Sequence, residues 1–242
     1  HSMHLIGLNL KKELNIKWIA DFRDPWTEID YFQQLPLTKK AIEKHHFLEK
    51  EVLKNADAVL VVGKTMRENF IKFSNQVITV TNGFDEEFAD SVAELDLKFT
   101  VTHIGLMNAD RNPKMLWEVL SEIISENAEF AADFELKLIG KTDTSVITDI
   151  SKYNLTKNVQ IIDYVTHDKV VEFQKKSQVL LLIVNNVPSA KGIITGKIFE
   201  YLMAKRPILA IAPTNGDLDE IIKETNSGVV IDFKDKIGLK RS

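Results

Sequence analysis

The chain alternates between short apolar runs and longer segments in which apolar residues recur every three or four positions. The short runs are rich in Val, Ile and Leu, which is typical of buried strands in a parallel sheet. The longer segments have the period of helices that cover such a sheet. We therefore predict an α/β fold built from βαβ units. The predicted strands are Ile16–Ala20, Ala58–Val62, Val77–Val80, Phe99–Ile104, Phe134–Ile139, Val159–Ile162, Val179–Ile183, Ile208–Ile211 and Gly228–Ile231.

The predicted strands form two series, separated by an acidic stretch without a clear period. Residues 4–84 hold three of them and predict part of a Rossmann-like domain, and residues 85–97 predict a linker. Residues 98–232 hold six, enough for a complete doubly wound parallel sheet. Because the first series amounts to about half a domain, we expect the chain to be a fragment. The predicted helices are Leu37–Asn55, Lys64–Phe73, Pro113–Ser125, Ser145–Lys152, His167–Lys176, Gly196–Ala204 and Leu218–Glu224.

Composition and charge exclude several classes of protein. The longest nearly apolar run, Val179–Val184, is far shorter than the roughly 20 residues of a membrane-spanning helix. Lys and Arg number 31 against 35 Asp and Glu, so the basic excess of a nucleic-acid-binding protein is missing. The chain has no cysteine, which excludes disulfides and thiolate metal sites. Its six histidines lack the spacing of a zinc pair, so we read them as structural and expect no metal site.

The first candidate site is the turn after the predicted strand Phe99–Ile104. Gly105 ends this strand, and Arg111 and Lys114 lie at the start of the next predicted helix. A glycine at such a turn lets the backbone approach a ligand, and a helix N-terminus attracts phosphate. The alternative is an ordinary turn with solvated cations.

The second candidate site opens the predicted helix Gly196–Ala204. Its first turn exposes backbone N–H groups and holds Lys197. Glu200 lies one turn further, where its carboxylate can accept hydrogen bonds from two neighbouring sugar hydroxyls. The alternative is a carboxylate that merely suits the positive end of the helix dipole.

The segment Lys197–Leu202 reads K-I-F-E-Y-L and resembles a motif of retaining GT-B glycosyltransferases of the family-4 group. That group includes bacterial polysaccharide and lipopolysaccharide sugar transferases. Three further segments are similar to the family and follow its order, namely Ile19–Trp26 with D-F-R-D-P-W, Asn55–Leu60, and Val80–Asp85 with N-G-F-D. The similarity runs from about residue 5 to residue 231. The first Glu of the family's motif falls at Gly192, which leaves the donor sugar open.

The resemblance implies a GT-B fold and assigns roles to residues. Glu200 would bind the ribose hydroxyls of the donor, and Tyr164 and Val165 would pack against its base. The alternative for Tyr164 is a half-buried loop aromatic. The residue after Gly105 is Leu106 and not the family's Arg, so other cations would replace it. The implied diphosphate-binding residues are Gly105, Arg111, Lys114, Thr195, Gly196 and Lys197, and the implied interdomain-cleft residues are Arg23 and Asp24.

The implied function is transfer of a sugar, of hexosyltransferase type, from a nucleoside-diphosphate sugar to a glycan or lipid-linked acceptor. The donor is a substrate, and no cofactor or nucleic-acid partner is implied. We expect a cytoplasmic protein, with peripheral association at the inner face of the membrane and a dimer of the truncated form as further hypotheses. The fragment alone is expected to be inactive, and its catalytic residues are unassigned. The alternatives are a GT-B sugar-nucleotide epimerase and a non-catalytic nucleotide-sugar-binding domain.

Overall fold

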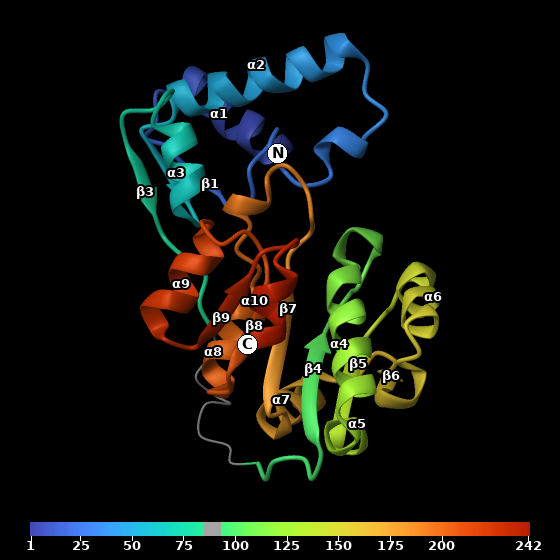
Figure 1. Ribbon diagram of the computed structural model, residues 1–242. Helices are drawn as coiled ribbons and strands as arrows, with labels where there is room; N and C mark the ends of the chain where they lie inside the picture. The colour runs from blue at the N-terminus through green and yellow to red at the C-terminus, as the bar shows by residue number, and fades with distance from the viewer. Residues whose placement is uncertain (85–92) are drawn as a thin grey trace. The chain divides into compact units, whose positions relative to one another are not determined.

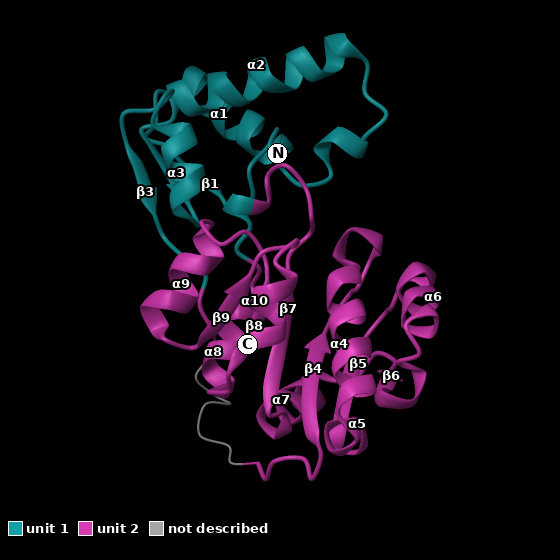
Figure 2. Cartoon of the chain, in the orientation of Figure 1, with its two compact units in different colours: residues 1–82, 191–194 teal, residues 83–190, 195–242 magenta. Residues whose placement is uncertain are grey.

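The computed structural model describes residues 1–84 and 93–242 (Figure 1). Two compact units make up the chain, and Figure 2 colours them separately. Unit 1 comprises residues 1–82 and 191–194, and unit 2 comprises residues 83–190 and 195–242. Of the predicted linker 85–97, residues 85–92 lie outside the described residues. The domain boundaries expected at residues 84 and 98 stay predictions.

Unit 1 contains a three-stranded parallel sheet with the strand order β1-β2-β3. Its register places Ile19 opposite Ala58 and Val59 opposite Val77. Valines and other apolar residues of these strands form a core with α2 and α3. The elements are α1 (Ser2–Leu14), β1 (Ile19–Phe22), η1 (Phe32–Gln34), α2 (Lys39–Asn55), β2 (Ala58–Val61), α3 (Lys64–Phe70) and β3 (Val77–Thr79).

A buried carboxylate fixes the loop that follows β1. Glu49 of α2 is 7% exposed and accepts a hydrogen bond from the backbone N–H of Trp26 at 3.1 Å. It also accepts the hydroxyl of Thr27. A buried charge is stable only when it is well hydrogen-bonded, so this contact ties the loop to the helix.

Unit 2 contains a six-stranded parallel sheet with the order β6-β5-β4-β7-β8-β9. The 3₁₀ turn η5 (Ala190–Gly192) begins at the end of segment 83–190 of unit 2 and continues into segment 191–194 of unit 1. The other elements are β4 (Phe99–Ile104), η3 (Ala109–Arg111), α4 (Lys114–Glu126), α5 (Ala128–Asp133), β5 (Phe134–Ile139), α6 (Thr144–Lys152), η4 (Thr156–Asn158), β6 (Val159–Ile162), α7 (His167–Lys176), β7 (Val179–Ile183), α8 (Lys197–Ala204), β8 (Ile208–Ile211), α9 (Asp217–Thr225), β9 (Gly228–Ile231) and α10 (Lys236–Arg241).

This order confirms the doubly wound α/β fold expected from the sequence. Counted within unit 2, the strands lie in the order 3-2-1-4-5-6, which is that of a Rossmann fold. The chain reverses direction across the sheet between β4 and β7. In such sheets ligands bind outside the carboxyl ends of the strands at this switch point.

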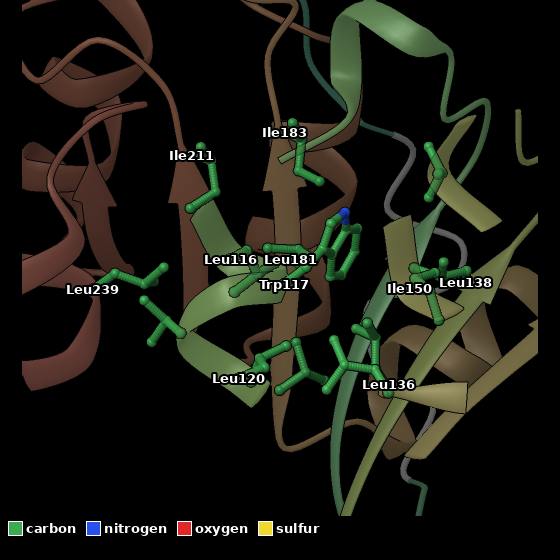
Figure 3. Close-up of a cluster of buried hydrophobic side chains, with 14 of the residues drawn as sticks. Leu116, Trp117, Leu120, Leu136, Leu138, Ile150, Leu181, Ile183, Ile211 and Leu239 are labelled. Atoms are coloured by element: carbon green, nitrogen blue, oxygen red, sulfur yellow. The ribbon is translucent and has the colours of Figure 1, made fainter. Parts of the chain in front are cut away.

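The main core of unit 2 lies between the sheet and the helices α4, α6 and α10 (Figure 3). Trp117 of α4 is fully buried there among Leu136, Leu138 and Leu181 of the central strands. Ion pairs hold α10 against α4, because Lys236 lies 2.6 Å from both Glu118 and Glu122. These pairs are exposed, so each contributes little to stability.

The structure departs most clearly from the sequence predictions at β1, α5 and α10. β1 begins at Ile19, three residues after the start of the predicted strand Ile16–Ala20, and ends at Phe22. It continues beyond Ala20 because Asp21 takes part in the ladder opposite Leu60. α5 was missed because its six residues are too few to show a helical period. α10 was missed because its charged sequence reads as a tail, although Asp235 caps it by accepting the N–H of Gly238 at 2.8 Å.

The described residues contain neither a membrane-spanning helix nor a cluster of metal-binding side chains. None of their helices is both long and apolar enough to cross a bilayer. The same residues include no group of three or more His, Asp or Glu side chains placed to hold a metal ion.

Candidate functional site

The candidate site lies in unit 2, where β4 ends at the switch point. Gly105 has a φ of +112° and Gly140, after β5, has a φ of +107°, a backbone conformation that favours glycine. The N–H of Gly105 donates to the carbonyl of Ile139 at 2.7 Å, so the turn is held against the neighbouring strand. A Cβ added at Gly105 would overlap the side chain of Lys197. The missing side chain therefore makes room for an ammonium group directly over the turn.

Two cations meet at this turn. Lys197 extends from the first residue of α8, and Arg111 donates through Nη1 to the carbonyl of Leu106 at 3.1 Å. Burial and, to a smaller extent, the charge of Arg111 together lower the pKa of Lys197 to about 8, although Glu200 opposes the shift. Lys197 thus lies over Gly105, and Arg111 is bonded to the next residue, Leu106. The structure therefore brings Lys197, of the second candidate site, to Gly105 and Arg111 of the first.

A buried histidine, His103, lies near Lys197 and Arg111. His103 of β4 is 1% exposed, and its Nδ1 donates to the carbonyl of Leu181 at 3.0 Å. Burial lowers the pKa of His103 to about 3, and nearby Lys197 adds to the shift. His103 is therefore uncharged at neutral pH, which is consistent with its interpretation as a structural residue.

Glu200 lies in the first turn of α8 and is partly exposed. Its Oε2 accepts a hydrogen bond from Nε2 of Gln174, on α7, at 3.1 Å. The next residue, Tyr201, is fully buried, and its hydroxyl accepts the N–H of Ile104 at 3.2 Å. This bond ties α8 to the end of β4 and so fixes where Glu200 and Lys197 lie relative to the Gly105 turn.

Sequence analysis did not select Gln174. The available signal was its position: it shares the inward face of α7 with Val171, and both are buried. A polar residue on the buried face of an amphipathic helix generally has a partner. Here that partner is the carboxylate of Glu200.

The residues around the start of α8 have an open side. Gly196 precedes the helix, and a Cβ added there would meet nothing within 4 Å. The hydroxyl of Thr195 is buried and has no hydrogen-bond partner among the described residues.

Tyr164, in the loop between β6 and α7, is 89% exposed, so the alternative of a half-buried aromatic is wrong. Val165 beside it is half-buried.

Lys114 is the first residue of α4 and lies near an acid of α6. Its Nζ is 4.0 Å from Oδ2 of Asp149 on α6, and that same oxygen accepts Nδ2 of Asn112 at 2.7 Å. Lys114 also lines a cavity of about 330 Å³ at the start of α4, together with Arg111 and Phe233. Its ion-pair partner is thus an acid of α6, whereas Arg111 lies beside Lys197.

The cleft residues expected in the first part of the chain belong to unit 1. Arg23 follows β1 and donates to Oδ2 of Asp21 at 2.9 Å and to Oδ1 of Asn82 at 3.2 Å. Asp24 next to it is exposed. Their assignment to an interdomain cleft stays a prediction.

The lowered pKa of Lys197 predicts a pH dependence of anion binding. An anion over the Gly105 turn needs the ammonium form, which predominates below pH 8 and is lost above it. We expect the affinity for a nucleoside diphosphate to be constant between pH 6.5 and 7.5 and to fall as the pH rises from 8 to 9.5. Calorimetric titrations across this range measure the effect. Lys197→Arg is the control, because its guanidinium stays charged throughout this pH range. The affinity of this variant for the nucleoside diphosphate should therefore change little with pH. A wild-type affinity that is flat up to pH 9.5 would contradict the assignment.

The model of the family described as glycosyl transferases group 1 matches residues 98–241, more than half of the chain. No curated protein sequence gives a significant match. Among solved structures, sucrose-phosphate synthase from Thermosynechococcus elongatus is similar with a TM-score of 0.70 at 18% identity. That match covers 98% of this chain and 60% of the synthase.

Two further structures are similar in fold. WaaG, a glycosyltransferase involved in lipopolysaccharide biosynthesis, matches with a TM-score of 0.68 at 13% identity, over 96% of this chain and 69% of WaaG. TarM of S. aureus, in a complex that contains UDP, matches with a TM-score of 0.59 at 16% identity, over 82% of this chain and 38% of TarM. This chain therefore spans only part of the length of these proteins, and the likeness confirms the GT-B type of fold.

Proposed function

Because the chain belongs to the glycosyl transferases group 1, we propose that it binds a nucleoside-diphosphate sugar, whose sugar is transferred to a glycan or lipid-linked acceptor. The observation that carries this proposal is the pair of cations over a glycine turn at the switch point of the sheet. Lys197 and Arg111 supply charge for a diphosphate, and Glu200 lies one turn along α8 from Lys197. Cations, N–H groups and a carboxylate for hydroxyls are the groups that a nucleoside diphosphate requires.

The proposed chemistry rests on stabilising the leaving group. Sugar transfer breaks the bond between the sugar and the diphosphate, and negative charge develops on the phosphate oxygen that departs. Fixed cations at that point lower the barrier because they interact more strongly with the transition state than with the donor. We assign Lys197 and Arg111 to this task, and we assign no residue as acid or base.

Uridine diphosphate is the nucleotide we favour. TarM and the pneumococcal O-GlcNAc transferase GtfA, both similar to this chain in fold, have been crystallised with UDP. We propose a hexose as the transferred sugar, and a cytoplasmic location at the inner face of the membrane if the acceptor is lipid-linked. Because the chain spans 60% of the length of the synthase it resembles, we expect it to bind the nucleotide without transferring sugar.

The first test measures which cations contact the diphosphate. Lys197→Ala and Arg111→Ala should each weaken binding of uridine diphosphate by about 1.5–3 kcal/mol, the range for hydrogen bonds to charged groups. Uridine monophosphate should lose less, because it lacks the second phosphate. The losses should shrink in added salt, because salt screens the attraction between these cations and the diphosphate. Calorimetry on the folded variants gives both numbers.

The matched control for this test is Lys114→Ala. Lys114 lies in the same segment, but its ion-pair partner is Asp149 on α6, so its loss should change diphosphate affinity less than the loss of Arg111. Equal losses for the mono- and diphosphate in the Lys197 and Arg111 variants would contradict the proposed phosphate site. Turnover of a labelled donor by a longer form of the protein would separate a transferase from a non-catalytic binding domain. Formation of an epimeric free donor would identify an epimerase.

A further inference from the structure

The buried amide of Gln174 donates a hydrogen bond to the carboxylate of Glu200. The helices α7 and α8 pack against each other, and Gln174 of α7 is 1% exposed at their contact. Its Nε2 lies 3.1 Å from Oε2 of Glu200. Glu200 has no other hydrogen-bond partner among the residues that the structure describes. The rotamer of this carboxylate therefore depends on one side chain.

The oxygen of the same amide destabilises the fold, and packing gives no reason for it. Oε1 of Gln174 is buried and has no hydrogen-bond partner within the described part of the chain. A buried polar atom without a partner destabilises a fold, and a methionine of similar shape would avoid that cost. Gln174 is thus a poor choice for packing alone. Its NH₂ group, which faces Glu200, gives a reason for an amide at this position.

The geometry leaves part of the carboxylate free. Gln174 occupies one lone pair of Oε2, so Oε1 and the remaining lone pair of Oε2 can still accept hydrogen bonds. Two adjacent hydroxyls on one ring need two acceptors at a fixed spacing. A carboxylate held in a single rotamer offers them with little loss of side-chain entropy on binding.

We propose that Gln174 is a positioning residue that orients Glu200 to recognise the vicinal 2′- and 3′-hydroxyls of the nucleotide. The inference rests on the proposed function of Glu200 as the ribose ligand. It adds that selectivity for a ribonucleotide depends on a residue that does not itself touch the nucleotide. Without the amide, the carboxylate can rotate away and loses the fixed spacing of its two oxygens.

The test is Gln174→Met in the full 242-residue chain, probed with uridine diphosphate and its 2′,3′-dideoxy form. We expect the affinity for uridine diphosphate to fall about tenfold, the lower end of the effect of a hydrogen bond to a charged group. The affinity for the dideoxy form should stay the same, because that nucleotide has no hydroxyls for Glu200 to bind. The melting temperature should stay equal or rise, because the unpaired Oε1 is removed. A residue with a merely structural role would give the opposite pattern.

The chain offers a matched control in a second glutamine of unit 2. Gln178, which precedes β7 at the opposite end of the sheet, accepts the N–H of Thr100 at 2.9 Å and donates to the carbonyl of Asp96 at 2.7 Å. Its amide is hydrogen-bonded through both its oxygen and its nitrogen, and its partners lie at the end of the sheet away from Glu200. Gln178→Met should lower the melting temperature and leave the ratio of the two nucleotide affinities unchanged.

The outcomes separate the inference from the function on which it rests. If the wild-type chain prefers uridine diphosphate over its dideoxy form and Gln174→Met keeps that preference, the positioning role is overturned while the ribose assignment of Glu200 stands. If the wild-type chain shows no preference, or binds neither nucleotide, the ribose assignment fails and the inference fails with it. If Gln174→Met keeps its fold but loses the preference for uridine diphosphate over the dideoxy form, both the ribose assignment of Glu200 and the positioning role of Gln174 are supported.

Discussion

Trp117→Ala is expected to lower the free energy of unfolding of unit 2 by about 3–5 kcal/mol. Trp117 is fully buried in the main core, among leucines of α4, β5 and β7 (Figure 3). Truncation removes its apolar surface and leaves a cavity that closely packed neighbours fill only in part. Its Nε1 also donates to Oδ1 of Asn112 at 2.7 Å, and that oxygen would lose its donor. Urea denaturation followed by circular dichroism measures the change.

The control for this prediction is Ile237→Ala. Ile237 lies on α10 and is 67% exposed, so its truncation removes little buried surface. The expected change is within about 0.5 kcal/mol of zero, as for most surface substitutions. If Trp117→Ala were no more destabilising than Ile237→Ala, the core described for unit 2 would be wrong.

Glu200→Ala is expected to weaken binding of a nucleoside diphosphate by about 2–3 kcal/mol, the range for hydrogen bonds to a charged group. The carboxylate is partly exposed in the first turn of α8, next to the cations that we assign to the diphosphate. Its loss would leave the two ribose hydroxyls without acceptors. Calorimetry with uridine diphosphate measures the loss directly.

Glu129→Ala is the matched control for Glu200→Ala. Glu129 lies in the first turn of another helix of unit 2, α5, and is exposed. Both variants lose one negative charge near a helix N-terminus, so a general effect of charge would appear in both. An unchanged affinity in a folded Glu200→Ala protein would show that this carboxylate does not bind the nucleotide.

Much of the fold of unit 2 could be predicted because strands such as β7 and β8 are mostly buried. Their runs, Val179–Ile183 and Ile208–Ile211, consist entirely of apolar residues, so they are visible in the sequence. β1 was harder, because its Asp21 is exposed and polar although it takes part in the ladder. Strand order was not visible in the pattern and is known only from the structure.

The candidate site was predictable where backbone chemistry restricts the residue type. Gly105 must be glycine for its φ of +112°, and a glycine between a strand and a helix is a local signal. Gln174 gave no comparable signal, because its partner Glu200 lies 26 residues away. The pairing of cations with acids also depends on three-dimensional packing. Lys114 beside Asp149 shows this, since no spacing in the sequence marks that pair.

The order of strands in unit 2 has a consequence for synthesis on the ribosome. β4 is made first but lies in the middle of the sheet, between β5 and β7. Once residue 162 has emerged, β4, β5 and β6 can pair, yet the other edge of β4 stays open until β7 is translated. At roughly 5–20 residues per second, the 21 residues from Ile162 to Ile183 take about 1–4 seconds. During that interval the nascent chain exposes unpaired backbone N–H and C=O groups along β4, and this open edge can pair with a strand of another chain.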